Sequence, residues 1–265
     1  MSTVMENMDF ADYVAADGIN ASAIKQGRTS MRHMDNYLNA PRTEATPAMV
    51  WGSIVHLAIL EPYRVMDEVV VWDESKRTKA YKEFKADNEG KYIITSQDVE
   101  NIGRMVESVY SHPEAKQFLD ESSKEVSLFA EGNYGKGKAR VDAMDSGMIC
   151  DLKTTSAIHP AQFQSQAWKL GYFTQMGWYA EMYEACHGHA PDAYIIALES
   201  KAPFDVMFWE ITSSSLRYGR EEALKIAKLY NITEMTECTH KGVCDGIQPL
   251  NIPEWVMEEP KLDFS

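Results

Sequence analysis

The sequence predicts an α/β fold in which helices flank a central β-sheet. Its 265 residues are 45% hydrophobic and 25% charged, so the chain is long and apolar enough to bury the core of one such domain. A β-hairpin is predicted in the middle of the chain, with β-prone and amphipathic helical segments on both sides of it. We expect a single domain over residues 1–265, with a mostly helical part at 1–120, a core at 121–232 and an irregular acidic tail at 233–265.

The charge and hydropathy of the chain exclude several classes of protein. The formal net charge of −14 argues against indiscriminate coating of nucleic acid, because phosphate binding needs clustered Lys and Arg. It is compatible with a local basic track inside a cleft. The sequence has no run of about 18 apolar residues, and it begins with acids where a signal peptide would carry a basic segment. We therefore expect a soluble, cytoplasmic protein without membrane contacts.

The cysteines give no sign of a metal or disulfide framework. The sequence has four, Cys150, Cys186, Cys238 and Cys244, and no C-x-x-C pair. Neither a zinc ribbon nor a set of disulfides is indicated. A bond between Cys238 and Cys244 that closes a loop stays open as an alternative.

The N-terminal part is predicted to be mainly helical. Residues 9–16 form a short amphipathic segment, and residues 20–22 supply a cap for a helix at 23–38. A linker follows at 41–47. A second helix, at 47–61, has a threonine N-cap, a proline at its first position and a proline directly after its end.

The remaining elements mix strands and helices. We expect the central sheet to begin with a strand at 124–130 and to reach the hairpin after a loop at 131–138. The strand at 192–199 is nearly all apolar and should be central, and Ser213 should cap the last helix. The other predicted ranges are 69–72 (strand), 92–95 (strand), 96–110 (helix), 113–119 (helical turn), 160–185 (helix), 206–211 (strand) and 213–230 (helix).

Basic residues gather in two places in this acidic chain. Lys25, Arg28 and Arg32 share one face of the first helix, which suits either phosphate contact or plain solvation. Residues 76–85 carry the densest basic cluster and are the best candidate for a track along a DNA backbone, with a solubilising helix face as the alternative. The cluster consists of Lys76, Arg77, Lys79, Lys82 and Lys85, with Tyr81 and Phe84 between them.

The predicted hairpin carries the most specific group of side chains. Its strands, at 139–143 and 148–153, flank a turn-forming Asp-Ser-Gly. Because side chains alternate along a strand, Asp151 and Lys153 must project from the same side. Asp142 on the partner strand can then complete a cluster.

Two carboxylates and a lysine on one patch of sheet are the groups that metal-assisted phosphodiester hydrolysis requires. Carboxylate oxygens bind Mg²⁺ or Mn²⁺ and leave positions open for a substrate phosphate. Such cations activate water, and Lys153 would orient that water or neutralise the developing charge. An ordinary salt-bridged strand pair is the alternative, since D-x-K occurs often by chance.

Three other elements carry candidate site residues. Glu125 lies on the strand that should neighbour the hairpin, so it can add a third carboxylate. His56 lies in the apolar part of the second helix, where either a satisfied core histidine or a metal ligand can stand. Tyr172, Gln175 and Tyr179 recur on one helix stripe and need buried hydrogen-bond partners, which an active site would provide.

Five motifs follow one another along the chain: G-x-x-x-H at 52–56, a strand bearing Glu125, R-x-D at 140–142, D-x-K-T-T at 151–155 and Y-x-x-Q-x-x-x-Y at 172–179. In order and spacing they resemble the PD-(D/E)XK nucleases. Within that superfamily the chain is most similar to the RecE (exonuclease VIII) branch of phage and prophage recombination exonucleases, related to lambda exonuclease and the RecB nuclease domain. The similarity covers nearly the whole chain. One departure is Val141, which stands before the first aspartate where the motif's name has a proline.

The resemblance implies a restriction-endonuclease-like core with a central mixed β-sheet, and it assigns roles to residues. The implied metal ligands are His56, Asp142, Asp151 and the Leu152 carbonyl. The implied catalytic residues are Asp142, Asp151, Lys153, Glu125, Gln175 and Tyr179. The DNA-binding residues expected with them are Arg28, Lys76, Arg77, Lys79, Lys82 and Arg140, of which Arg28 or a neighbouring basic residue would capture a 5′ phosphate.

The resemblance also implies an activity. Such proteins are Mg²⁺-dependent exonucleases, with one or two ions per site and Mn²⁺ able to substitute. They digest linear double-stranded DNA processively from the 5′ end and leave 3′ overhangs for a single-strand annealing protein of the RecT/Red-beta type. Relatives form trimeric or tetrameric rings around DNA, which would place a basic channel inside an acidic exterior. The expected setting is the cytoplasm of a bacterial host, with a phage or prophage origin.

Two other functions stay open. One is a PD-(D/E)XK nuclease of different duty, such as an endonuclease, a single-strand exonuclease or the CRISPR-associated iron–sulfur type. The iron–sulfur type needs an early cysteine, and none precedes Cys150. The other is a non-catalytic DNA-binding recombination protein with a degenerate site, against which the intact Asp142, Asp151 and Lys153 argue.

Overall fold

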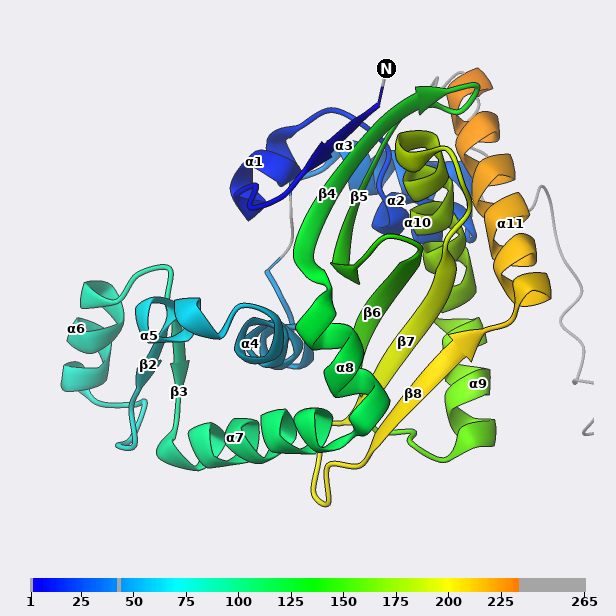
Figure 1. Ribbon diagram of the computed structural model, residues 1–265. Helices are drawn as coiled ribbons and strands as arrows, with labels where there is room; N and C mark the ends of the chain where they lie inside the picture. Colours follow the sequence, from blue (N-terminus) through cyan, green and yellow to red (C-terminus); the bar gives the residue numbers. More distant parts are fainter. Residues whose placement is uncertain (1, 42–43, 234–265) are drawn as a thin grey trace, which may run out of the picture.

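The central element of the fold is a six-stranded sheet in the order β1-β4-β5-β6-β7-β8 (Figure 1). The computed structural model describes residues 2–41 and 44–233. The predicted strands at 192–199 and 206–211 are confirmed residue for residue. The strands of the sheet are β1 (Thr3–Met5), β4 (Ser123–Gly132), β5 (Gly135–Met144), β6 (Met148–Thr155), β7 (Asp192–Glu199) and β8 (Val206–Ile211).

The sheet is mixed. From β1 through β6 each strand is antiparallel to the next, β6 and β7 are parallel, and β8 is antiparallel to β7. A parallel pair needs a long crossover connection, which α9 (Pro160–Lys169) and α10 (Tyr172–His187) supply here. The predicted α/β class, with a central mixed sheet flanked by helices, is thereby confirmed.

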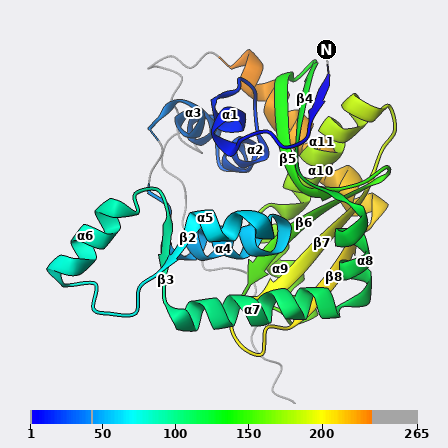
Figure 2. The ribbon, with the colours of Figure 1, turned by 60° about the vertical axis from the view of Figure 1, so that its left-hand side comes forward.

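Helices cover both faces of the sheet (Figures 1 and 2). One core, between the sheet and α2, α3, α10 and α11, includes Trp178 and Ile149. The second, beneath α4, α7 and α8, includes Met105 and Leu152. Ile149 and Leu152 lie on opposite faces of β6, so this strand is buried on both sides. The helices are α2 (Ala21–Gly27), α3 (Met31–Asn39), α4 (Pro47–Leu60), α7 (Ser96–Ser111), α8 (Pro113–Glu121) and α11 (Ser213–Ile232).

Two helices that the sequence predicted as continuous are each broken. The predicted helix at 23–38 is two helices, because the Ser30 side chain accepts a hydrogen bond from the His33 amide and begins α3. The predicted helix at 160–185 is interrupted at Gly171, whose φ of 69° is a left-handed conformation that an α-helix cannot continue. Each break lets the chain turn a new helical face toward the sheet.

The sheet is larger than predicted. The strand at 124–130 is not the first, because β1 pairs with β4 and places Val4 opposite Leu128. Most of the predicted loop at 131–138 is strand, since β4 ends at Gly132 and β5 begins at Gly135. The glycines in this stretch are weak strand formers, so the local sequence indicated a loop while the pairing of the two strands produced a tight hairpin.

Several helices begin directly after a residue whose side chain caps the first turn. The predicted N-cap Thr46 is confirmed for α4, where its hydroxyl accepts from the Met49 amide. Thr95 begins α7 with a complete capping box. The last helix differs from the prediction by one residue, because the N-cap of α11 is Thr212 and Ser213 is its first helical residue.

Residues 69–95 form a small lobe beside the main sheet (Figures 1 and 2). In it β2 (Val69–Val71) and β3 (Tyr92–Ile94) pair in parallel, and α6 (Lys79–Asp87) packs beside them. The centroid of the Trp72 ring lies 5.7 Å from that of the Tyr81 ring and 4.8 Å from that of the Phe84 ring. The two aromatic residues expected between DNA-binding charges therefore pack against Trp72 and are partly buried within the lobe.

Three short helices complete the described chain: α1 (Phe10–Ala15), η1 (Pro62–Arg64) and α5 (Val65–Glu68). Within residues 2–41 and 44–233, no helix combines the length and apolar character needed to cross a lipid bilayer. Most of the predicted acidic tail at 233–265, with Cys238 and Cys244, lies outside the described residues.

Candidate active site

A cleft of about 610 Å³ contains most of the predicted site residues. Its lining includes His56 from α4, Glu125 from β4, Asp142 from β5, and Leu152 and Lys153 from β6. Helix α4 and three consecutive strands, β4, β5 and β6, therefore contribute to one hollow surface.

The predicted hairpin is confirmed, and it brings its charged residues together. β5 and β6 are antiparallel neighbours. The Leu152 amide donates to Asp142 Oδ2 at 2.8 Å, and Lys153 forms an ion pair with Asp151. Two carboxylates and one ammonium group thus lie on neighbouring strands, as the alternation of side chains predicted.

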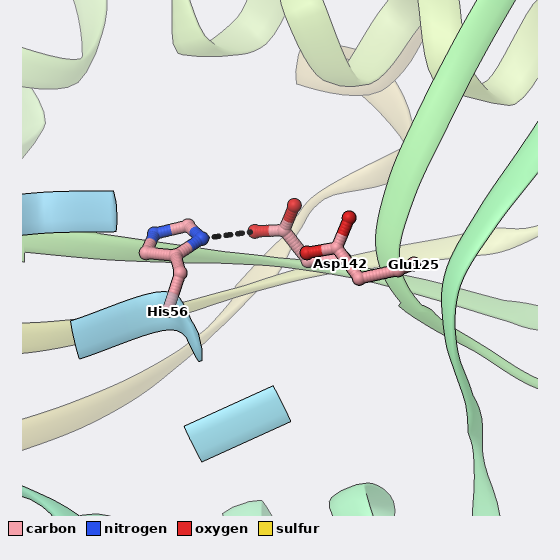
Figure 3. Close-up of side chains that lie close together, drawn as sticks. All are labelled: His56, Glu125 and Asp142. Carbon is pink, nitrogen blue, oxygen red and sulfur yellow. Dashed lines mark ion pairs between the residues drawn. The ribbon is translucent and has the colours of Figure 1, made fainter. Parts of the chain in front are cut away.

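Three side chains could hold a metal ion: His56, Glu125 and Asp142 (Figure 3). One ligand atom from each lies within 4.8 Å of the others, and His56 Nδ1 is 3.5 Å from Asp142 Oδ2. Glu125 falls between two paired residues of β4 but is itself left out of the ladder, with a φ of 52°. A left-handed conformation is costly for a non-glycine residue and is concentrated at functional sites.

Asp151 lies beside this group and is almost fully buried, with 1% of its surface exposed. Its Oδ1 accepts from Gln175 Nε2 at 2.6 Å. Its Oδ2 faces the Lys153 ammonium group and forms the ion pair with it. The assignment of Asp151 and of the Leu152 carbonyl as metal ligands stays a prediction.

Gln175 and Tyr179 find the hydrogen-bond partners that their buried stripe on α10 required. Besides its bond to Asp151, Gln175 Nε2 donates to Tyr179 Oη at 3.0 Å. Lys25 Nζ donates to Gln175 Oε1 at 2.9 Å. The amide of Gln175 is therefore oriented from both ends, with its oxygen toward an ammonium group and its nitrogen toward a carboxylate.

Lys25 is a residue of the site whose role beside Gln175 was not predicted. Its spacing with Arg28 and Arg32 indicated either phosphate contact or a solvated helix face. The signal that could have found it is the composition of α2, where the neighbouring Ala23 and Ile24 are fully buried. A lysine directly after such positions is drawn toward the core rather than toward solvent.

Burial and mutual repulsion raise the pKa values of the two carboxyl groups nearest His56. Burial, followed by the charge of Asp151, raises the pKa of Asp142 to about 7. Burial, followed by the charge of Asp142, raises the pKa of Glu125 to about 7 against the opposing effect of Arg140. Carboxyl groups shifted in this way by burial and by each other are typical of functional sites.

The nitrogen bases of the site respond differently to burial. Burial, followed by the charge of Lys153, lowers the pKa of His56, so its imidazole is neutral and has a lone pair to offer. Burial alone would lower the pKa of Lys153, but Asp151 and Asp142 outweigh it and raise the pKa, which keeps this ammonium group charged. Burial, followed by the charge of Lys153, lowers the pKa of Lys25 to about 8.

This set of donors fits a divalent cation. Carboxylate oxygens are the ligands that Mg²⁺ and Mn²⁺ prefer, and a neutral imidazole is compatible with Mn²⁺ and similar ions. Burial and a neighbouring carboxylate raise the pKa values of Asp142 and Glu125 to about 7, and a cation held between these groups would stabilise their ionised forms. The residues present are therefore suited to hold a divalent metal ion.

Arg140, predicted to contact DNA, is turned into the protein and is 9% exposed. Its Nε donates to Glu125 Oε2 at 2.5 Å, and its Nη1 donates to the Met8 carbonyl at 2.7 Å and to Ser127 Oγ at 3.3 Å. Glu125 is the buried charge that draws it inward. The sequence showed that Arg140 was basic but could not show this partner on the neighbouring strand.

Arg28 is also engaged by the protein. Its Nε lies 3.3 Å from Glu222 Oε1, its Nη1 donates to the Trp168 carbonyl at 3.0 Å, and its guanidinium lies over the Trp168 ring. Capture of a 5′ phosphate by Arg28 stays a prediction, and such a phosphate would compete with Glu222 for the guanidinium group. Helix α6 of the lobe lies away from strands β5 and β6 (Figure 1). Four basic residues of the lobe that were predicted to contact DNA are exposed. These are Lys76, Arg77, Lys79 and Lys82.

A comparison with protein families matches residues 20–248 to the PDDEXK-like domain of unknown function (DUF3799). The chain belongs to this family. All five motifs lie within the matched range, and the recognition of a PD-(D/E)XK fold from them is confirmed. A comparison with curated proteins finds no match.

Solved structures resemble this PDDEXK-like chain at low sequence identity. A candidate exonuclease from Eubacterium rectale aligns over 96% of this chain and 99% of its own, with 14% identity and a TM-score of 0.64, which supports a shared fold. A phage-related exonuclease from Haemophilus somnus 129PT covers 81% of this chain and 93% of its own, at 12% identity and a TM-score of 0.37. LHK-Exo in complex with dAMP covers 84% and 91%, at 12% identity and a TM-score of 0.35.

Proposed function

We propose that this PDDEXK-like protein is a metal-dependent nuclease, and more finely a Mg²⁺-dependent, processive 5′→3′ exonuclease on linear double-stranded DNA. Its product would carry 3′ overhangs for recombination by strand annealing. The observation that carries the proposal is the meeting of Asp142 and Lys153 with His56 and Glu125 at one cleft, with Asp151 buried beside Lys153. The polarity and the product rest on the motif resemblance.

The carboxylates and the histidine have a common task in such a reaction. His56, Glu125 and Asp142 would hold a divalent cation, with Asp151 and the Leu152 carbonyl as further ligands. When bound, the cation would make water a stronger nucleophile and offset negative charge on the phosphate. Mg²⁺ is the expected ion and Mn²⁺ a substitute, with one or two ions per site.

Lys153 would act as a charged donor and not as a base. Its pKa is raised by Asp151 and Asp142 despite burial, so the ammonium group is protonated at neutral pH. Placed in the cleft, it would orient the attacking water and stabilise the negative charge that develops on the phosphate. Gln175, held by Lys25, would keep the Asp151 carboxylate in place beside it.

For partners we propose duplex DNA ends, further copies of this chain in a trimeric or tetrameric ring, and a single-strand annealing protein of the RecT/Red-beta type. The proposed setting is the bacterial cytoplasm, with a phage or prophage origin. The net charge of −14 supports a confined route for DNA, because an acidic exterior repels DNA everywhere except at a local basic surface. The exposed basic residues of the lobe are candidates for that surface.

The test is digestion of a linear duplex that is labelled separately at each 5′ and each 3′ terminus, with Mg²⁺ and with a chelator. We expect early release of the 5′ labels, retention of the 3′ labels on long single strands, and no release with the chelator. Early release of 3′ labels would overturn the polarity. Equal digestion with the chelator would overturn the metal-dependent site.

Three controls separate the alternatives. A closed circular plasmid should stay intact, whereas an endonuclease would cut it, and a single-stranded substrate tests for a single-strand exonuclease. The variant Asp151→Asn keeps the shape of a buried side chain and should bind DNA but lose at least about a hundredfold in rate. A wild-type chain that binds DNA ends without digesting any of these substrates would be the non-catalytic recombination protein.

A further inference from the structure

The N-terminal residues 3–16 form a strap that is fastened to the sheet at several places along its length. β1 pairs with β4, the Met8 carbonyl accepts from Arg140 Nη1 at 2.7 Å, and Lys138 holds the C-terminal end of α1. Lys138 Nζ donates to the carbonyls of Tyr13 at 3.0 Å and Val14 at 3.1 Å and also bonds to that of Ala16. A buried ammonium group thus satisfies carbonyls that the end of a helix leaves without partners.

The strap is one wall of the candidate active-site cleft. Phe10, Tyr13 and Val14 line the cleft from α1, opposite the residues of α4. Tyr13 is 7% exposed, whereas Phe10 is 55% exposed. An exposed aromatic ring at the edge of a nuclease cleft offers a surface on which a base can stack.

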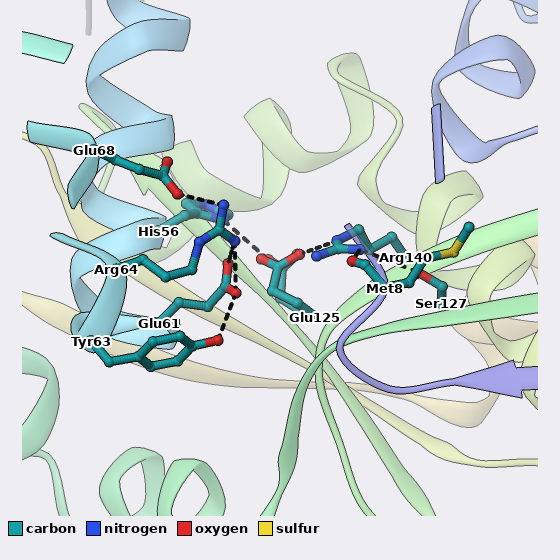
Figure 4. Close-up of polar contacts among 10 residues, drawn as sticks. Met8, His56, Glu61, Tyr63, Arg64, Glu68, Glu125, Ser127 and Arg140 are labelled. Carbon is teal, nitrogen blue, oxygen red and sulfur yellow. Dashed lines mark hydrogen bonds and ion pairs between the residues drawn. The ribbon is translucent and has the colours of Figure 1, made fainter. Parts of the chain in front are cut away.

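One side chain joins this wall to the candidate metal group. The Arg140 guanidinium bonds Glu125 through Nε and Met8 through Nη1 (Figure 4). Ser127 on β4 adds a third contact to Nη1. The bond to Arg140 uses one oxygen of the Glu125 carboxylate, Oε2, and leaves the other available to a cation.

We propose that Arg140 is a positioning residue, which fixes Glu125 for the metal ion and the N-terminal strap as the wall of the cleft at the same time. The inference rests on the proposed metal-dependent function. A guanidinium presents its donors in a rigid plane, so the carboxylate and the Met8 carbonyl are held at a fixed offset from each other, which the single point of a lysine ammonium cannot do. By thermodynamic linkage, a cation that orders Glu125 also stabilises the strap, and a firmly held strap strengthens cation binding.

A phosphate contact by Arg140, as the sequence suggested, makes different predictions. It would leave cation binding and the strap unchanged in the absence of DNA. In addition, replacing Arg140 would then reduce the slope of log K against log salt for DNA binding by about 0.9 for each phosphate contact that is lost. Measurements with and without DNA therefore separate the two roles.

The test uses the full chain with Arg140→Lys and measures two properties without DNA: Mn²⁺ binding by calorimetry and hydrogen exchange of residues 3–16. We expect about tenfold weaker Mn²⁺ binding, as for other residues that orient a metal ligand, together with faster exchange in the strap. In the wild type, Mn²⁺ should slow that exchange, and in the variant it should not. Wild-type values of both properties would overturn the proposal.

The matched control is Lys136→Gln, which removes a neighbouring positive charge from β5. Lys136 pairs with Asp17 on the surface, and its side chain is 61% exposed. It should change neither Mn²⁺ binding nor strap exchange. An equal effect of this control would reduce the role of Arg140 to general electrostatics and so refute it.

A second variant covers the case in which Arg140→Lys does not fold. Glu125→Gln keeps the shape of the side chain but removes the charge that holds Arg140, and Glu125 itself has no bond to the strap within the described residues. We expect faster strap exchange without DNA or metal, and unchanged exchange would contradict the coupling. Neither readout needs nuclease activity, so failure of this inference is distinguishable from failure of the proposed function.

Discussion

Asp142 shows how a residue suited to bind a cation weakens the fold that carries it. Burial and the charge of Asp151 raise the pKa of Asp142 to about 7. A carboxyl group whose pKa is higher in the folded chain than in the unfolded chain binds more protons when folded. Its unfavourable effect is absent below the unfolded pKa, grows between pH ~4 and pH ~7, and stays constant above that window.

Asp142→Asn should therefore stabilise the protein in the absence of metal. We expect a gain in free energy of unfolding on the order of 1 to 3 kcal/mol at pH 8 and a much smaller gain at pH 5, because the wild-type carboxyl group is then mostly protonated. Thermal unfolding with a chelator measures this, and Asp67→Asn on the surface of α5 is the control. Equal gains at both pH values would contradict the raised pKa.

Lys25 offers a second prediction at the residue scale. Lys25→Met keeps the apolar stem of the side chain and removes the ammonium group that orients Gln175. Because Gln175 in turn bonds Asp151, we expect kcat to fall by about 10- to 100-fold with little change in KM for DNA. The exposed Gln26→Met is the control. A loss confined to KM would instead indicate that Lys25 binds the substrate.

The sequence could predict those site residues whose relative positions are fixed by neighbouring residues along the chain. Asp151 and Lys153 were predictable, because alternation along one strand fixes their common side. The inward turn of Lys25 and of Arg140 was not, because it depends on partners, Gln175 and Glu125, that only the folded chain brings near.

Helices α10 and α11 show at the scale of elements how closely this fold is packed. A Cβ atom on Gly219 would lie 2.0 Å from the Phe173 carbonyl oxygen, and one on Gly177 would lie 2.1 Å from the Arg220 amide nitrogen. Both obstacles are backbone atoms, which cannot move aside. The two helices therefore cross at a distance that only glycine permits at these positions.

Gly219→Ala should destabilise the protein by at least about 2 kcal/mol, since α10 and α11 must separate to admit a methyl group. The matched control is Gly103→Ala on α7, where a Cβ would meet nothing within 4 Å. It should be neutral or stabilising by about 0.5 to 1 kcal/mol through helix propensity. Urea unfolding of both variants measures the difference, and equal stability would refute the close crossing.

At the same scale, the sequence predicted where elements occur better than where helices break. Strands β7 and β8 were predictable, β7 from a nearly continuous apolar run. The breaks before α3 and α10 were not, because Ser30 and Gly171 are each tolerated inside helices and become breaks only when tertiary packing favours a new direction.

For the whole molecule, the question is how an acidic protein would hold DNA. The exposed basic residues of the lobe lie on α6 and in the loop before it, and α6 lies away from strands β5 and β6 (Figure 1). These residues would therefore touch duplex beyond the point of cleavage. Neutralising Lys76, Arg77, Lys79 and Lys82 together should weaken DNA binding. It should also reduce the slope of log K against log salt by about 0.9 for each phosphate that the variant no longer binds.

The rate at saturating DNA should stay near the wild-type value in this variant, since the carboxylate cluster is untouched. The control is Lys201→Ala with Lys225→Ala, two exposed lysines on other parts of the surface. If the lobe variant and the control show the same slope as the wild type, the lobe is a solubilising surface and DNA takes another path.

The pairing of β1 with β4 has a consequence for synthesis of the chain. Thr3 lies opposite Phe129, so the first strand leaves the ribosome long before its partner exists. Until then the backbone amides of β1 can be satisfied only by water or by another molecule. The edge of β4 that pairs with β1 also stays uncovered until the two strands meet. Nascent chains stalled before residue 129 should therefore be prone to aggregation, whereas longer chains can cover the edge of β4 with β1.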